Sequence, residues 1–253
     1  MNKIILVFFL AILLFSGTYA LKQVEPYSQT LKDDTLVGRA VPDSTLELVV
    51  SKENEKFDTL KIVNTLPEGF SAAVKHELES FKVLITIPGE ANNESYKLNL
   101  EFYNSADPFS KETAEVYFMV DSGLLFASMD NFSQETFAGE AAEYAFTLIN
   151  NSDAKTYFTI TSSLPSSWHG NFAVQVLPKS IAKEKDYVTP GISGERRFVF
   201  TVDYGGEEKE FNATIKAKPT IESKFASTLN GLPFYSFSLI PNYLLNGLFA
   251  LLF

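Results

Sequence analysis

The side chains best suited to chemistry in this chain are two histidines, a single tryptophan and scattered carboxylates. His76 and His169 do not form the His-Glu-x-x-His motif of zinc proteases, because Ser80 stands where a second histidine would follow His76-Glu77. With these two histidines and no cysteine, the chain is also poor in zinc ligands. It has no nucleophile elbow, phosphate-binding loop or dinucleotide fingerprint. We therefore expect no catalytic residue, no metal site, no cofactor and no enzymatic activity.

The acidic residues leave one enzymatic alternative open. Paired carboxylates hydrolyse glycosides only where a cleft holds them at a defined separation, which a sequence does not show. Asp33-Asp34 and Glu207-Glu208 have the pattern of solvated turns. No calcium-binding Asp-x-Asp-x-Asp-Gly loop is present. A hydrolase with an unrecognised acid pair is therefore a third interpretation of the chain.

Trp168 has two possible roles, ligand binding or packing at the end of a core. It closes the motif Leu164-Pro165-Ser166-Ser167-Trp168, and its flat face could stack on a sugar ring. An equivalent motif, Leu66-Pro67-Glu68-Gly69-Phe70, occurs earlier in the chain. Since both copies place an aromatic ring after the proline, we expect Trp168 to cap one end of a core and keep glycan contact as the alternative. We expect His169, beside this loop, at the surface or at a hinge.

Asn-x-Ser/Thr sequons are the candidate modification sites. They begin at Asn93, Asn131, Asn150 and Asn212. Such short motifs also arise by chance in a chain rich in asparagine and serine. Asn212 lies between the apolar Phe211 and Ala213 in an alternating run, so we expect its amide to face outward.

The elements that carry these residues are runs of alternating apolar and polar side chains, the pattern of half-buried β-strands. After the N-terminal segment no stretch shows a sustained helical period, and Pro, Gly, Asn and Asp separate the runs. The runs span 46–50, 81–87, 96–102 and 116–120 in a first block, and 144–148, 158–160, 172–176, 198–204 and 211–217 in a second. The last two flank Gly205-Gly206 and predict a β-hairpin.

The two blocks share a plan, because each places a Leu-Pro-x-x-aromatic motif between two strands. Proline ends the first of these strands by removing a backbone donor. In the second block, Asn150-Asn151, the motif ending at Trp168 and Phe198-Val199-Phe200 precede a closing hairpin. This order resembles the Ig-like repeats of archaeal and bacterial surface proteins and the α-galactosidase-associated sandwich domains. The resemblance covers Gly123–Pro219 and, more weakly, Val41–Asp121, and it implies a sandwich fold used in spacers, stalks and binding modules.

Both ends of the chain indicate export and attachment. Lys3, the apolar run Ile4–Phe15 and the small-residue site ending at Ala20 have the layout of a cleaved secretory signal peptide. The apolar run is shorter than the ~20 residues that span a bilayer. The segment Leu232–Phe253 is apolar and uncharged, and it is long enough for a span. Prolines and asparagines interrupt it, so an interfacial helix, a hydrophobic hairpin or a packed segment are alternatives to a span.

Charge and cysteine content narrow the class further. The net charge of −10 excludes nucleic acid as an expected partner, since the phosphates carry the same sign. The absence of cysteine favours a prokaryotic source, because small eukaryotic secreted domains commonly carry disulfides. The resemblance to the Ig-like surface repeats implies an archaeal source in particular.

The sequence therefore predicts an all-β fold of two tandem Ig-like antiparallel β-sandwiches. We expect a signal peptide at residues 1–20, sandwiches at 21–121 and 122–219, and a hydrophobic C-terminal segment at 220–253 that associates with the membrane. The predicted function is that of a non-enzymatic extracellular glycoprotein of the cell surface with a structural, adhesive or envelope-assembly role. Its expected partners are the membrane, other envelope proteins or glycans. A carbohydrate-binding surface module is the alternative.

Overall fold

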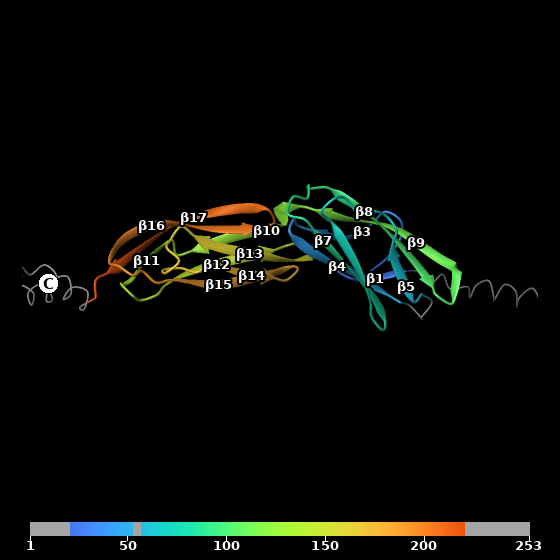
Figure 1. The fold of residues 1–253 in the computed structure, drawn as a ribbon, viewed down its shortest axis with the longest axis horizontal. Coiled ribbons are helices and arrows are strands. Elements are labelled where there is room, and N and C mark those ends of the chain that lie inside the picture. The colour runs from blue at the N-terminus through green and yellow to red at the C-terminus, as the bar shows by residue number, and fades with distance from the viewer. Residues whose placement is uncertain (1–20, 53–56, 221–253) are drawn as a thin grey trace, which may run out of the picture. The chain divides into compact units, whose positions relative to one another are not determined.

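The computed structural model describes residues 21–52 and 57–220. The predicted signal peptide and the hydrophobic segment from residue 221 onward lie outside these residues. Strands joined by short turns make up most of the described chain, and Ser122–Leu124 forms a single 3-10 turn, η2 (Figure 1). The predicted all-β class is confirmed. Within the described ranges, no helix is long and apolar enough to cross a membrane.

The chain divides into two compact units. The first contains the described residues up to Leu125 together with Asn150–Thr156 and Leu177–Lys179. The second contains Phe126–Ile149, Tyr157–Val176 and the described residues from Ser180 onward. Two short segments that interrupt the second unit in sequence are therefore counted with the first.

The first unit is a sandwich of two sheets. One has the strand order β2-β1-β4-β7-β6 and the other the order β3-β9-β8-β5. The strands are β1 (Lys22–Glu25), β2 (Gln29–Thr30), β3 (Thr35–Ala40), β4 (Ser44–Ser51), β5 (Thr59–Ile62), β6 (Ser71–His76), β7 (Ser80–Ile87), β8 (Ser95–Asn104) and β9 (Asp107–Val120). Neighbouring strands run antiparallel, except that β3 pairs in parallel with β9.

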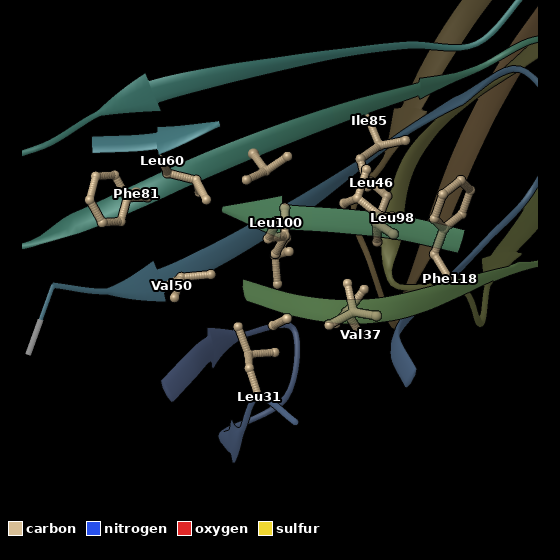
Figure 2. Close-up of a cluster of buried hydrophobic side chains, with 14 of the residues drawn as sticks. Leu31, Val37, Leu46, Val50, Leu60, Phe81, Ile85, Leu98, Leu100 and Phe118 are labelled. Carbon is tan, nitrogen blue, oxygen red and sulfur yellow. The ribbon is translucent and has the colours of Figure 1, made fainter. Parts of the chain in front are cut away.

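Alternation along the strands gives this unit its core. Because successive side chains of a strand point to opposite faces, every second residue of β4 and β7 is buried. Figure 2 shows Phe81 and Ile85 of one sheet with Leu98, Leu100 and Phe118 of the other. All five are fully buried. The strand periodicity therefore buries a continuous apolar layer between the two sheets.

Phe70 lies at the edge of this core. It is partly buried against the apolar cluster, with its ring centroid 4.5 Å from that of Tyr96 and 6.1 Å from that of Phe118. The prediction that the first Leu-Pro-x-x-aromatic motif caps a core is confirmed for Phe70.

The second unit is also a sandwich. One sheet has the order β10-β12-β15, and the other has the order β11-β17-β16-β13 with β14 paired to β13. The strands are β10 (Leu125–Asp130), β11 (Ser133–Phe137), β12 (Ala142–Asn150), β13 (Ala154–Ser162), β14 (Phe172–Val176), β15 (Ser180–Val188), β16 (Gly194–Tyr204) and β17 (Glu207–Lys218). Gly205 and Gly206, both with positive φ, turn β16 into β17, which confirms the predicted hairpin.

The two units share one Ig-like plan and differ in the strand that follows the motif. In each, an early strand pairs in parallel with the last strand, β3 with β9 and β11 with β17. In each, the Leu-Pro-x-x-aromatic motif follows the strand β5 or β13. The next strand then differs, because β6 pairs with β7 whereas β14 pairs back onto β13. The strand after the motif has thus changed sheet between the two copies.

Candidate functional site: a groove beside Trp168

The turn after β13 is fixed by backbone hydrogen bonds. The N–H groups of Trp168 and His169 both donate to the carbonyl of Pro165, at 2.8 and 3.2 Å. The carbonyl of Trp168 accepts from the N–H of Thr189, just after β15, at 2.9 Å. Ser163 is held against β16, since its N–H donates to the Val199 carbonyl at 2.9 Å and its Oγ accepts from the Val199 N–H at 3.0 Å. The turn is therefore tied to three separate strands or their ends.

His169 anchors this turn inside the unit. Its side chain is 1% exposed, its Nε2 lies 2.6 Å from Oδ2 of Asp186, and its Nδ1 lies 2.9 Å from Oγ of Ser162. The imidazole also meets the ring of Phe200 edge-on at 5.4 Å. The prediction that His169 lies at the surface or at a hinge is wrong, because hydrogen bonds satisfy both ring nitrogens and make burial tolerable.

The side chain of Trp168, in the same turn, does not lie in the interior. It is half-buried and forms part of a groove of about 430 Å³ in the second unit. The groove is lined by Ser163, Leu164, Pro165, Trp168, Ile192, Arg196, Arg197 and Phe198. A Cβ on Gly191 would lie 3.1 Å from Nε1 of Trp168, so the absent side chain lets the indole lie close to this backbone. The ring that reaches the core from this turn is His169, so Trp168 and Phe70 differ in their surroundings.

Charge distinguishes this groove from the rest of the chain. Arg196 and Arg197 are exposed, and neither forms an ion pair or side-chain hydrogen bond within the described residues. The described lining of the groove includes no carboxylate. Ile192 adds an exposed apolar side chain to the lining. The groove thus combines an indole, an aliphatic wall and two free guanidinium groups.

A second hollow of about 400 Å³ adjoins the first. It shares Ser163, Arg197 and Phe198 and continues over Asn212 and Thr214 of β17. Asn212 is exposed, as its alternating run predicts. Its sequon is therefore accessible, and it opens into this hollow.

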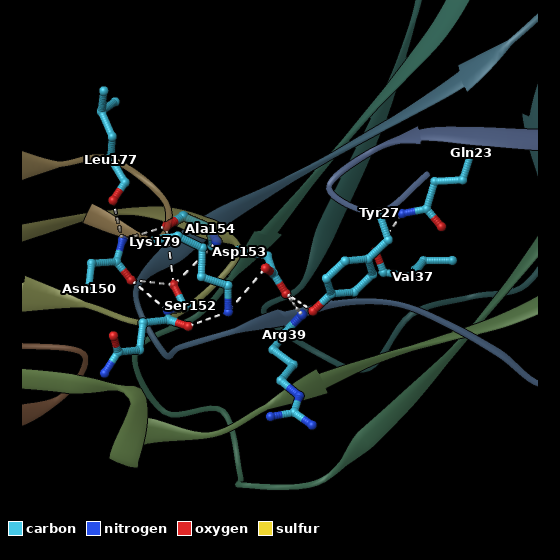
Figure 3. Close-up of polar contacts among 11 residues, drawn as sticks. Gln23, Tyr27, Val37, Arg39, Asn150, Ser152, Asp153, Ala154, Leu177 and Lys179 are labelled. Atoms are coloured by element: carbon cyan, nitrogen blue, oxygen red, sulfur yellow. Dashed lines mark hydrogen bonds and ion pairs between the residues drawn. The ribbon is translucent and has the colours of Figure 1, made fainter. Parts of the chain in front are cut away.

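Asn150 is placed very differently. It is 0% exposed, and its amide donates to the carbonyls of Ala154 at 2.8 Å and Leu177 at 3.1 Å (Figure 3). Its Oδ1 accepts from the N–H and the hydroxyl of Ser152. The folded chain therefore does not present Asn150 for glycosylation, which corrects the sequence prediction for this site.

The same region of the first unit contains a buried carboxylate. Asp153 accepts hydrogen bonds from the Tyr27 hydroxyl and from the N–H of Arg39, and it pairs with Lys179 at 3.2 Å (Figure 3). Burial and the hydrogen bond to Asp153 raise the pKa of Tyr27 to about 12. Because the Asp153 carboxylate is bonded to Tyr27, Arg39 and Lys179, this cluster stabilises the fold and is not a candidate ligand site.

The remaining sequons lie at the surface. Asn93 is exposed but exchanges two hydrogen bonds with Ser122, through Oδ1 at 3.0 Å and Nδ2 at 3.1 Å. Asn131 is exposed in a turn with φ of 61°. His76 is also exposed, with Nδ1 3.2 Å from the Asp58 carbonyl oxygen. No cluster of three metal-ligating side chains forms in the described part of the chain.

The first unit has an acidic groove of about 540 Å³ between β8, β9 and the turn that precedes β3. Asp33, Asp34, Glu101 and Glu115 contribute to its lining. Asp33 Oδ1 accepts from the Glu115 N–H and the Asp34 N–H donates to the Glu115 carbonyl, so these residues form a turn that closes on β9. This agrees with the turn expected at Asp33-Asp34.

The sequence prediction missed Ile192, Arg196 and Arg197 as site residues. The available signal was compositional, because Arg196 and Arg197 are adjacent in a chain that has only one other arginine, Arg39. Nothing in the spacing of these residues relates them to Trp168. Strand pairing between β13 and β16 brings them together.

No family model and no curated protein sequence matches this chain. Similar solved structures include an endo-fucoidan hydrolase from glycoside hydrolase family 107 (13% identity, TM-score 0.38), the D00-D0 domain of intimin (12%, 0.29) and a chimeric titin Z1Z2 (9%, 0.35). The matches cover 75%, 78% and 79% of this chain and 28%, 99% and 98% of those chains, in the same order. The chain thus spans under a third of the hydrolase. At these identities the likeness concerns the fold alone.

Proposed function

We propose that this chain is a non-enzymatic protein of a prokaryotic cell surface, with a structural or adhesive role carried by its two Ig-like units. The observation that most supports this proposal is the placement of the serine, histidine and aspartate side chains of the second unit. Ser162, His169 and Asp186 hold the Trp168 turn in place, and the groove that the turn borders is open to solvent. The unit therefore presents a rigid recognition surface.

Hydrogen bonds join Ser162, His169 and Asp186, the three residue types that form a Ser-His-Asp catalytic triad. In such a triad the serine hydroxyl must be able to reach the substrate that it attacks. Here Ser162 is absent from the described lining of the groove, and its Oγ accepts from the Leu164 N–H at 3.3 Å. His169 and Asp186 are both buried. This placement favours a role in positioning the turn over one in attacking a ligand.

The export of the chain rests on its N-terminal sequence pattern, and its attachment on the apolar C-terminal segment. The first test is membrane fractionation of cells producing the full chain, beside cells producing a chain that ends at Pro219. The shorter chain keeps every described strand, since β17 ends at Lys218. We expect only the full chain to pellet and to resist alkaline carbonate extraction. A full chain that stays in the soluble fraction would contradict attachment through this segment.

A carbohydrate-binding surface module is the second candidate. The observation that favours it is the half-buried indole of Trp168 along an open groove, since a flat aromatic face suits a sugar ring. In this case the adhesive partner would be an envelope or environmental glycan. Retention of the full chain on immobilised polysaccharide is the direct measurement, and loss of retention in a folded Trp168→Ala variant is the expected result.

A further inference from the structure

We propose that the Trp168 groove binds an acidic polysaccharide, with a pyranose ring on the indole and uronate carboxylates on Arg196 and Arg197. This inference rests on the proposed adhesive function and names the chemistry of its ligand. Two features of the second unit support it: the local charge and the way in which the turn is anchored.

The charge argument begins with the contrast between groove and chain. The chain has a net charge of −10, yet the described lining of this groove contains two guanidinium groups and no carboxylate. Neither guanidinium is neutralised by a described partner. A planar guanidinium matches a carboxylate through two parallel N–H···O bonds, which the ammonium group of lysine does not offer. A cationic pair left free in an acidic protein favours an anionic ligand.

Anchoring keeps the indole in place before any ligand arrives. The Trp168 carbonyl is bonded to Thr189, and the adjacent His169 is fixed between Ser162 and Asp186. Gly191 provides the space in which the indole lies. Binding that requires no rearrangement of the aromatic platform loses less entropy, which is an advantage for a weakly interacting ligand such as a sugar chain.

The test is affinity electrophoresis of the full chain in mild detergent, on native gels containing polygalacturonate. Parallel gels contain methyl-esterified polygalacturonate, which has the same sugar backbone without the charge, or neutral dextran. We expect retardation by polygalacturonate alone. The retardation should weaken as salt is added, because the ion pairs at an open groove are screened.

Two variants address the residues. Arg196→Ala with Arg197→Ala should raise the dissociation constant for polygalacturonate by roughly tenfold or more, since charge-assisted hydrogen bonds are lost. Ile192→Glu should do the same, because it places a carboxylate in the groove that would repel the anion. Ile192 is exposed, so this variant does not disturb the core. The matched control is Lys32→Ala with Lys75→Ala, which removes the same charge from exposed positions of the first unit and should bind like the wild type.

Each contrary outcome has a definite meaning. Equal retardation by the esterified polymer would overturn the role of the arginines. Equal weakening by the lysine control would mean that binding depends on the overall charge of the protein alone. Absence of retardation on every gel, while the chain is still displayed and cells still adhere, would overturn this inference and leave the proposed function standing. A chain that is not displayed on cells at all would instead overturn the proposed function.

Discussion

Trp168 and His169 are neighbours in sequence, yet one lines a groove and the other lies in the interior. The difference follows from hydrogen-bonding capacity. A buried imidazole needs a partner for each nitrogen, and Ser162 and Asp186 supply them. An indole has one donor and a large flat surface, so it is effective where one face stays accessible. The residue that is buried is therefore the one whose polar atoms the fold can satisfy.

Replacing His169 by Ala should destabilise the protein by about 3 to 5 kcal/mol. The change leaves Asp186 with the Tyr187 N–H as its remaining described donor and opens a cavity against Phe200. Urea unfolding followed by far-ultraviolet circular dichroism measures the effect. His76→Ala is the matched control, because His76 is exposed, and it should change stability by less than about 0.5 kcal/mol. Equal effects from the two histidines would contradict the anchoring role of His169.

Replacing Asn150 by Ala should lower the free energy of unfolding by about 2 to 3 kcal/mol. The variant leaves the carbonyls of Ala154 and Leu177 without the Asn150 amide, and the Ala154 carbonyl lies in a buried site. Asn212→Ala, at an exposed sequon, should have almost no effect in the same urea titration. Mass spectrometry of the protein from a glycosylating host should find Asn150 unmodified. A glycan on Asn150 of folded protein would contradict the buried position.

At the level of strands, the parallel pairing of β3 with β9 depends on one glycine. The register of this pair shifts between Leu36 and Gly38. A Cβ on Gly38 would lie 2.8 Å from Cδ1 of Leu46, which is fully buried in β4. The glycine therefore lets two sheets approach where a side chain would separate them.

Gly38→Ala should cost about 1 to 3 kcal/mol, because the added methyl group overpacks the core and the buried side chain of Leu46 would have to shift. Thermal unfolding followed by circular dichroism would show a lower midpoint. Gly89→Ala is the control within the same unit, since its nearest contact would be an ordinary 3.9 Å to Asp43 Cβ. A Gly38→Ala protein as stable as this control would contradict the close approach.

Ion pairs join Glu47 to two lysines, of which Lys155 lies in the part of β13 that is counted with the first unit. Glu47 of β4 contacts Lys82 of β7 at 2.8 Å and Lys155 of β13 at 3.5 Å. Partial burial acts to raise the pKa of Glu47, but the hydrogen bonds and charges of the two lysines outweigh it and hold the pKa below the usual 4.5. A carboxyl with a lowered folded pKa stabilises the protein above its unfolded pKa. That contribution is lost as the pH falls through the folded value.

Glu47→Gln should therefore reduce stability at pH 7 by about 0.5 to 1 kcal/mol, a value kept small by solvent screening. The difference from wild type should shrink as the solution is acidified below pH 4.5 and then disappear. Urea titrations at a series of pH values measure it. Glu68→Gln, at an exposed carboxylate of the same unit, should show no such pH-dependent difference. A constant deficit at every pH would indicate lost packing instead of lost charge.

At the level of the molecule, sequence periodicity predicts the strands with one deeply buried face. The expected runs in β4, β7, β8, β9, β12, β16 and β17 are confirmed. The strand β15 is missed because its residues Ile181, Lys183, Lys185 and Tyr187 face solvent, so charge hides the alternation. Period alone also does not say which strands pair. The groove therefore could not be predicted, since it joins the Trp168 turn to Arg197 of β16 through pairing between distant segments.

The parallel pairs at the ends of each unit have a mechanical consequence. In the second unit β11 runs from Ser133 to Phe137 alongside Thr214 to Lys218 of β17. Tension that enters through β11 and leaves through β17 pulls the two strands in opposite directions along their length. All the ladder bonds are then loaded together in shear and do not open one by one. The first unit has the same arrangement in β3 and β9, so each unit should resist stretching as a single clamp.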